Sequence, residues 1–189
     1  MTTSTAPATL TGTYRLDPTH SRIGFVARHA MVTKVRGSFK ELTGTGTFDV
    51  EEPSRSSLQL TIEVASMDTA NPDRDGHLRS NDFLDLEHYP QITFTSTSVT
   101  QVEPATHRVT GGLAIKGATR PVTFDLAHAG SAVDLYGNQR VGLEGSTTIN
   151  RKDWGVNRNA ALEAGGVLVS EKVALELDIS AIKDAVTAA

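Results

Sequence analysis

The stretch that decides the fold runs from Ser57 to Ala65 and reads Ser-Leu-Gln-Leu-Thr-Ile-Glu-Val-Ala. Its apolar side chains occupy every second position, with polar residues between them: Leu58, Leu60, Ile62 and Val64. Successive side chains of a β-strand point to opposite faces, so this alternation predicts a strand with one buried and one wet face. Such strands are typical of antiparallel sheets, which commonly pack only one face on a core.

The same alternation recurs along most of the chain. Its apolar positions are Ile23, Phe25 and Ala27; Phe48 and Val50; Ile92 and Phe94; Leu113 and Ile115; Val122, Phe124 and Leu126; Val141 and Leu143, running on to Ile149; and Val173, Leu175, Leu177 and Ile179. With residues 57–65, these segments predict an all-β protein of about eight antiparallel strands. Such a set closes into a barrel or forms a two-sheet sandwich, and periodicity does not separate the two.

One internal segment departs from the alternation. Residues 71–73 read Asn-Pro-Asp, which is turn chemistry, and Leu78 and Phe83 follow among polar residues. The pattern predicts a short helix near residues 74–80, with Asp73 as its N-cap. Residues 159–164 are a second candidate for a helical turn.

The length and composition suit one globular domain with room inside it. The chain has 189 residues, of which 38% are hydrophobic and 5% aromatic. We expect a single barrel domain over residues 11–182, between tails at residues 1–10 and 183–189. An eight-stranded barrel is either filled by its own side chains or holds one ligand. Few aromatic residues and many Thr, Gly, Ala and Val residues favour a cavity.

The composition also excludes several classes of function. With no cysteine there is no disulfide, thiol nucleophile or Cys-ligated metal. A formal net charge of −4 argues against a nucleic-acid partner. No apolar run approaches the roughly 18 residues of a membrane span. The first residues lack both the positive and the apolar region of a signal peptide, so we expect a cytoplasmic protein.

Four segments, taken in order and spacing, resemble a known family. They are Leu16-Asp17-Pro18-Thr19-His20-Ser21 through Phe25 and Arg28-His29 to Val35-Arg36-Gly37-Ser38-Phe39; Arg74-Asp75-Gly76-His77-Leu78-Arg79-Ser80-Asn81-Asp82-Phe83-Leu84-Asp85 with Tyr89-Pro90; Gly112-Leu113-Ala114-Ile115-Lys116-Gly117 with Arg120-Pro121-Val122; and Asn150-Arg151-Lys152-Asp153-Trp154-Gly155. Over residues 14–182 the chain resembles the YceI-like family of polyisoprenoid-binding proteins. Leu84 and Trp154 stand where the family usually has Phe, and these apolar changes should reshape a lining rather than abolish binding.

The resemblance implies an extended, lipocalin-like antiparallel barrel that holds a long isoprenoid or other lipid tail in its bore. The side chains that we expect to line the cavity are Ile23, Phe25, Phe48, Leu60, Ile62, Leu78, Phe83, Phe94, Ile115, Phe124, Leu143, Ile149 and Trp154. Pattern alone favours the alternative that these residues form a packed core. The ligand itself is the only bound group expected, with no cofactor, and a homodimer stays open.

Polar residues near the predicted helix are candidates for the barrel mouth. His20, His77, Arg79 and Arg151 are candidates to meet the polar head group of a ligand, and the alternatives are a strand-end hydrogen bond for His20 and a solvated turn for Arg151. Arg suits phosphate because its planar fork makes paired hydrogen bonds. The alternation of opposite charges favours a structural role for Arg79, as the ion-pair partner of Asp75 or Asp82.

The sequence indicates neither catalysis nor a metal site. Asp17, His20 and Ser21 lie close in sequence, but adjacent residues on a strand point to opposite faces and no Gly-x-Ser-x-Gly elbow is present. The six histidines show no close pair of the kind that binds zinc. We therefore expect a non-catalytic carrier or store of an isoprenoid lipid. The alternatives are an enzyme that acts on a lipid or small ester through His77 or His20 with a carboxylate, and an interaction module with a filled barrel.

Overall fold

The computed structural model describes residues 10–163 and 168–185. Its strands are β1 (Gly12–Leu16), β2 (Arg22–His29), β3 (Thr33–Phe39), β4 (Leu42–Phe48), β5 (Ser57–Glu63), β6 (Met67–Asp68), β7 (Gln91–Glu103), β8 (Thr106–Ile115), β9 (Ala118–Val133), β10 (Gln139–Asn150) and β11 (Lys172–Lys183). Between them lie the helix α1 (Pro72–Arg79) and the 3-10 helices η2 (Pro53–Arg55), η3 (Val64–Ser66) and η4 (Arg151–Trp154). None of the helices in the two described ranges is long or apolar enough to cross a membrane. The predicted tails lie largely outside these ranges.

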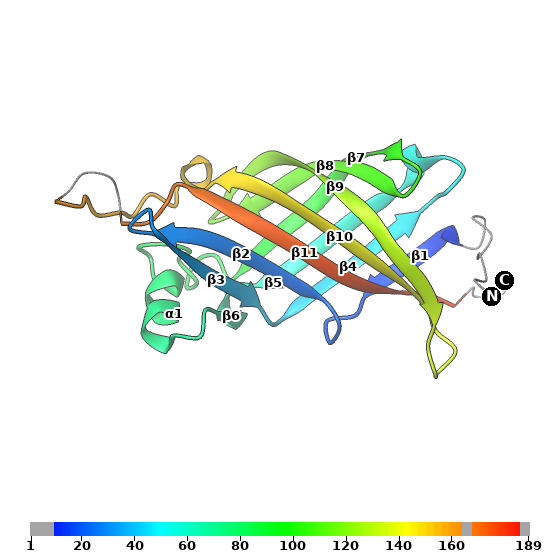
Figure 1. Cartoon of the computed structure of the whole chain (residues 1–189), viewed down its shortest axis with the longest axis horizontal. Helices are drawn as coiled ribbons and strands as arrows, with labels where there is room; N and C mark the ends of the chain where they lie inside the picture. Colours follow the sequence, from blue (N-terminus) through cyan, green and yellow to red (C-terminus); the bar gives the residue numbers. More distant parts are fainter. Residues whose placement is uncertain (1–9, 164–167, 186–189) are drawn as a thin grey trace.

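All strand pairs are antiparallel, and the pairing of β1 with β11 closes the sheet into a barrel (Figure 1). β1 and β2 follow one another along the same edge of β11, so together they act as one interrupted strand. The same holds for β3 with β4 and for β5 with β6. The ring therefore has eight strands in up-and-down order, which confirms the predicted all-β barrel and eliminates the sandwich.

The strand predicted over residues 57–65 ends earlier than its alternation suggests. β5 stops at Glu63, and η3 turns the chain from Val64 onward. The Val64 side chain is only 1% exposed, and its backbone N–H donates to the Pro90 carbonyl at 2.9 Å. The break bends the chain so that β6 pairs with β3 instead of continuing along β4. The alternation of apolar residues indicates which face of the strand a residue occupies, but it does not reveal such a bend.

The predicted short helix is present as α1, with a different cap. It starts at Pro72, because the side chain of Asn71, and not that of Asp73, accepts a hydrogen bond from the Arg74 N–H at 3.0 Å. Proline suits the first helical position, where the missing N–H would have no helical partner. Residues 159–163 form no helix, and residue 164 lies outside the described ranges.

The two ends of the barrel are built differently (Figure 1). At one end, which we call the helix end, lie α1, the β8–β9 turn and η4. At the other, the terminal end, lie the β4–β5, β7–β8 and β9–β10 connections together with both ends of the described chain. This division follows from the up-and-down order, because every second connection returns to the same end.

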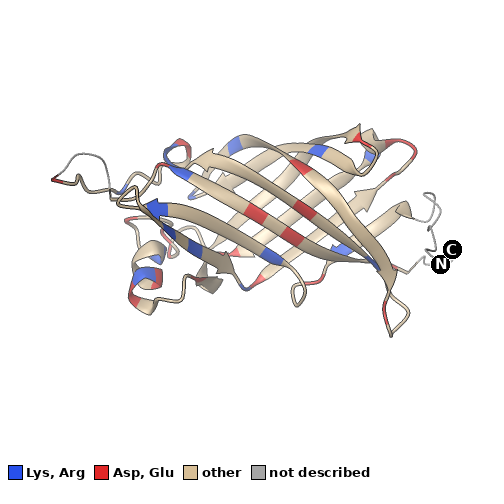
Figure 2. Cartoon of the chain, viewed as in Figure 1, with Lys and Arg blue, Asp and Glu red and all other residues tan. Residues whose placement is uncertain are grey.

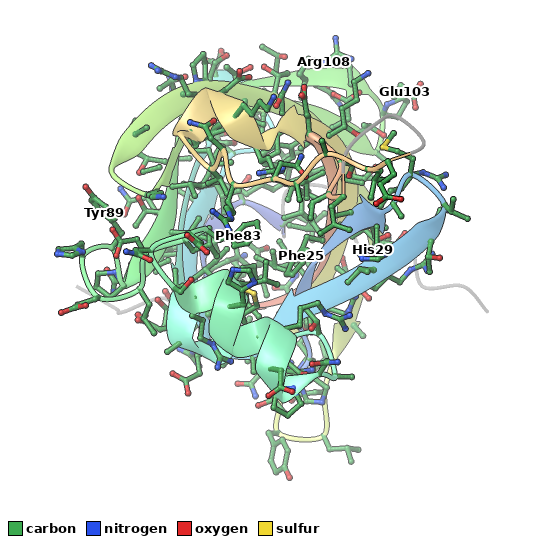
Figure 3. The ribbon with its side chains drawn as sticks, turned by 90° about the vertical axis from the view of Figure 1, so that its left-hand side faces the viewer. Phe25, His29, Phe83, Tyr89, Glu103 and Arg108 are labelled. Carbon is green, nitrogen blue, oxygen red and sulfur yellow. The ribbon has the colours of Figure 1, made fainter. Side chains whose placement is uncertain are left out.

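The interior of the helix end is packed. Phe83 and Trp154 are 6% and 3% exposed and belong to one buried apolar cluster. The rings of Phe25 and Phe39 contact each other, with centroids 5.7 Å apart. Figure 3 looks onto this end and shows Phe25 and Phe83 within the ring of strands, next to α1. The helix end is therefore the closed end of the barrel.

Candidate functional site

The terminal half of the barrel encloses a cavity of about 300 Å³. Its wall is mostly apolar, and every strand of the ring contributes to it. Along β8 the lining extends from His107 to Leu113, about 20 Å at the rise of a β-strand. Val50 and Pro104, from the β4–β5 and β7–β8 connections, also line it, which places its mouth at the terminal end.

Strand alternation explains most of the lining. On β9 the inward residues are every second one: Val122, Phe124, Leu126 and His128. On β7 the inward parity changes between Phe94 and Val99, which both face the cavity. The reason is a register shift between Ser96 and Ser98, where β7 carries an extra residue relative to β8.

Part of the free space comes from β4. Its inward positions between Leu42 and Phe48 are Gly44 and Gly46, and both border the cavity. Neither residue has a side chain to fill the interior. A Cβ atom on Gly46 would lie 3.0 Å from the Ser57 carbonyl oxygen, so even alanine fits tightly there. The two glycines therefore leave space along this wall of the cavity that larger side chains would fill.

The structure divides the predicted lining residues between the two halves of the barrel. Those that border the cavity are Ile23, Phe48, Leu60, Ile62, Phe94, Phe124 and Leu143. Those that do not border the cavity, although they belong to or pack against the same buried cluster, are Phe25, Leu78, Phe83, Ile115, Ile149 and Trp154. Alternation identifies the inward face of a strand correctly in both groups, but it carries no information on height along the barrel.

None of the residues predicted at the mouth lies on the cavity. His77 and Arg79 belong to α1, which covers the opposite, closed end. His20 pairs with Asp17 at 2.8 Å beside the interruption between β1 and β2. Arg151 is buried, where its guanidinium donates to backbone carbonyls, among them that of Ser170 at 2.9 Å. The prediction placed His77 and Arg79 beside an opening under the helix, whereas the structure places the mouth of the cavity at the other end of the barrel.

The predicted ion pair of Arg79 with Asp75 or Asp82 is also wrong. Arg79 donates to the Met67 carbonyl, and its Nε is buried without a partner among the described residues. The buried Asp75 carboxylate accepts from the N–H of Thr69 at 3.0 Å and from its hydroxyl. Asp82 pairs with His77 at 2.9 Å instead. The carboxylates are satisfied by nearer donors, so the helix is held by hydrogen bonds to the backbone.

The polar residues that line the cavity near its mouth include Gln101, His107 and His128, together with Ser56 and Ser57. The rings of His107 and Phe48 meet edge to face, with centroids 5.0 Å apart. Burial lowers the pKa of His107, and nearby His128 lowers it further. Sequence analysis missed both histidines, although each continues the inward alternation of its strand, His107 before Val109 and His128 after Leu126.

The charged residues of the barrel strands are exposed or half-buried, and Figure 2 marks their positions on the ribbon. Arg108, next to His107 in sequence, points outward and pairs with Asp125 through two bonds of 2.8 and 2.9 Å. Acidic residues also mark the outer faces of β10 and β11, where Glu144 lies opposite Asp178. Among the described residues that line the cavity there is no Asp, Glu, Lys or Arg. The described lining of the cavity therefore carries no fixed charge.

A hydrogen-bonded network fixes the β9–β10 connection near the mouth. Arg140 binds Asp17 through Nη1 at 2.5 Å and Asp134 through Nε at 2.8 Å. The Arg140 guanidinium is the main reason that the pKa of Asp17 falls to about 2, and it also lowers the pKa of Asp134. The Arg140 guanidinium thus links the β9–β10 connection to Asp17, which directly follows β1.

Among the described residues, Asp17, His20 and Ser21 do not form a catalytic triad. The Ser21 hydroxyl donates to the Ser180 carbonyl at 3.1 Å and accepts from its N–H at 3.0 Å, so it is not directed at His20. Within residues 10–163 and 168–185, no group of three His, Asp or Glu side chains could hold a metal ion. What the site offers is an apolar cavity with a polar mouth.

Curated relatives match over most of their length. A UPF0312 protein of Staphylococcus epidermidis is 38% identical over 164 residues, which are 86% of this chain and 93% of that protein. A UPF0312 protein of Photorhabdus laumondii is 38% identical over 151 residues, 79% of this chain and 78% of that protein. Both alignments therefore take in nearly the whole barrel.

Solved structures share the barrel. BcnA of Burkholderia cenocepacia superimposes with a TM-score of 0.75 at 25% identity, over 87% of this chain and 98% of that one. The YCEI protein of Campylobacter jejuni gives a TM-score of 0.71 at 26% identity, over 84% and 90%. A polyisoprenoid binding domain from Saccharophagus degradans gives 0.63 at 17% identity, over 90% and 98%, which shows a common fold. The sequence model of the YceI-like domain matches residues 14–181, and the chain therefore belongs to the YceI-like family.

Proposed function

We propose that the protein binds one hydrophobic lipid of isoprenoid type, tail first, in the barrel cavity, and stores or carries it unchanged. The observation that carries the proposal is the cavity itself, which is apolar, closed at the helix end and open at the terminal end. The structural neighbour described as polyisoprenoid binding has the same fold, and its ligand class suggests which lipid to test first.

The physical basis is the burial of a chain that needs no directional contacts. Each methylene group moved from water into the cavity contributes about 0.8 kcal/mol before the entropic cost of binding. The cavity volume of about 300 Å³ lies at the lower end of the range for small-molecule sites. It suits a single chain, and a longer chain would leave its remainder outside the mouth.

The decisive experiment extracts the purified protein with organic solvent and identifies the released lipid by mass spectrometry. Leu143→Trp is the test variant, because Leu143 borders the cavity and is not among the fully buried residues. Added bulk there enters the space of the ligand rather than that of packed side chains. Glu144→Trp is the matched control, since Glu144 is exposed on the outer face of the same strand.

We expect wild type and Glu144→Trp to release the same lipid in similar amount, and Leu143→Trp to release much less. A folded Leu143→Trp protein with unchanged occupancy would overturn the cavity as the binding site. An extract without lipid, joined to failure of added prenyl lipids to bind, would favour an interaction module. Conversion of an added lipid or ester would favour an enzyme.

A further inference from the structure

The mouth of the cavity brings two imidazoles together on neighbouring strands. In the β7–β8–β9 wall, His107 lies opposite Gln101 on one side and Leu126 on the other. The His128 N–H donates to the Ala105 carbonyl at 2.8 Å, which continues the β8–β9 pairing by one step toward the mouth. His107 and His128 are therefore diagonal neighbours on the inner face, within reach of a shared partner.

Each imidazole keeps a nitrogen available to a ligand. The His107 ring contacts Phe48, and its nitrogens form no hydrogen bond with the residues that the structure describes. His128 uses Nε2 for the Ser131 hydroxyl at 2.8 Å, which leaves its Nδ1. Gln101 donates through Nε2 to the Pro104 carbonyl at 3.2 Å, which leaves its amide oxygen. Both histidines thus offer a ring nitrogen at the mouth.

Among the described residues that line the cavity, no carboxylate balances a charge on these rings. Of the titratable groups near His107, Arg108 and Asp125 neutralise each other on the outer face, and His128 is the one that faces it on the inside. The Tyr14 phenol, farther round the wall, donates to the Leu10 carbonyl at 2.7 Å. A protonated imidazole at the mouth therefore has to find its counter-ion in a ligand.

We propose that His107 and His128 form a head-group subsite for the carboxylate of a lipid acid whose chain occupies the cavity. This inference rests on the proposed function and adds the chemical class of the head group. A carboxylate held between the two rings would accept charge-assisted hydrogen bonds and relieve the repulsion between them. Its single negative charge balances one protonated imidazole, and the other ring can donate a neutral N–H.

A phosphate head group fits this mouth less well. Phosphates are usually met by the paired donors of Arg or by Lys, and the described cavity lining contains neither. The arginines of α1 and η4 lie at the closed helix end, on the far side of the packed cluster. We therefore expect the mouth to bind a carboxylate head group more tightly than either a phosphate or a neutral alcohol.

The test compares three ligands that share one prenyl chain: farnesoic acid, farnesol and farnesyl phosphate. Each is titrated into delipidated protein, in wild type and in the double variant His107→Gln/His128→Gln. Glutamine stays polar but cannot carry a positive charge. His20→Gln is the control, because His20 pairs with Asp17 and does not line the cavity.

We expect wild type and His20→Gln to bind farnesoic acid about tenfold more tightly than farnesol, which is the size of one charge-assisted contact. The double variant should lose this preference and keep its affinity for farnesol, which also shows that it is folded. Equal binding of acid and alcohol in wild type overturns the subsite but leaves the lipid cavity intact. Binding of farnesyl phosphate as tight as that of the acid overturns the carboxylate assignment. Failure of all three ligands overturns the proposed function together with the subsite.

Discussion

The indole N–H of Trp154 donates a hydrogen bond to the carbonyl of Leu113 at 2.8 Å, and so fastens η4 to β8. Both residues belong to the buried apolar cluster, but Leu113 borders the cavity and Trp154 does not. The bond therefore joins the inner limit of the cavity to the packing that closes the helix end. A tryptophan can do this where a phenylalanine cannot, because only the indole carries a donor.

We predict that Trp154→Ala lowers the free energy of unfolding by about 3–5 kcal/mol, as expected for the loss of a buried aromatic side chain. Trp154→Phe should cost about 1–2 kcal/mol, since it keeps most of the packing and loses the hydrogen bond. Urea denaturation of lipid-free protein measures both. Tyr136→Ala, at an exposed position, should change stability by less than about 0.5 kcal/mol. If Trp154→Phe is as stable as wild type, the bond to Leu113 contributes nothing.

Arg79→Ala should destabilise the protein by about 1–3 kcal/mol, because it removes the bond to the Met67 carbonyl and the packing of the side-chain stem. Affinity for lipid should not change, since Arg79 lies at the closed end. Thermal melting and lipid titration of the same variant check the two statements. Arg15→Ala, which breaks the exposed ion pair with Asp184, is a control expected to cost less than about 1 kcal/mol. A large loss of lipid affinity in Arg79→Ala would contradict the closed helix end.

The stability of the fold should depend on the ionisation of the Asp17 carboxyl at low pH. Its pKa is lowered to about 2, mainly by Arg140, and Asp17 and Arg140 are both largely shielded from solvent. A carboxyl with a depressed pKa stabilises the fold above its unfolded-state value, and this contribution is lost as the pH falls from about 4 to about 2. The contribution is about 2 kcal/mol. Asp17→Asn should flatten this part of the pH–stability curve, and an unchanged curve would assign the acid sensitivity to other groups.

The protonation of His107 should affect the stability of the fold in a different pH range. Burial and His128 lower its pKa, so the unfolded chain binds the proton more readily than the folded chain. Stability of the lipid-free protein should therefore fall as the pH drops below about 6.5. His107→Phe should remove this component, as measured by unfolding at a pH of about 8 and about 5.5. A pH difference of the same size in the variant would show that His107 does not cause it.

The fold could be predicted because alternation along residues 57–63 and its counterparts reflects a local property of strands. The closure of β1 on β11 could not be read in this way, because it depends on residues far apart in sequence. Phe25 and Phe124 illustrate the limit for the site. Both face inward, but only Phe124 borders the cavity, since height along the barrel is set by strand register and by the interruptions.

The mouth residues escaped prediction for a related reason. His77 attracted attention because it lies in a conspicuous charged segment, yet that segment hydrogen-bonds to itself at the closed end. His107 lies among ordinary strand residues, and its position becomes informative only when the β7–β8 connection is placed at the open end. The signal available in the sequence was a histidine at an inward position of an otherwise apolar alternation.

The described chain begins at Leu10, which borders the cavity, and ends at Ala185, one residue after Asp184 donates its N–H to the Thr13 carbonyl at 2.8 Å. Both ends of the described chain therefore lie beside the mouth of the cavity, which is the entrance for the ligand (Figure 1). A purification tag, a reporter protein or a surface linker joined to a chain shortened to residues 10–185 would stand beside the path of the ligand and turn the entrance toward its support. For immobilised assays, the exposed β2–β3 turn around Val32, at the opposite end, is the better place for attachment.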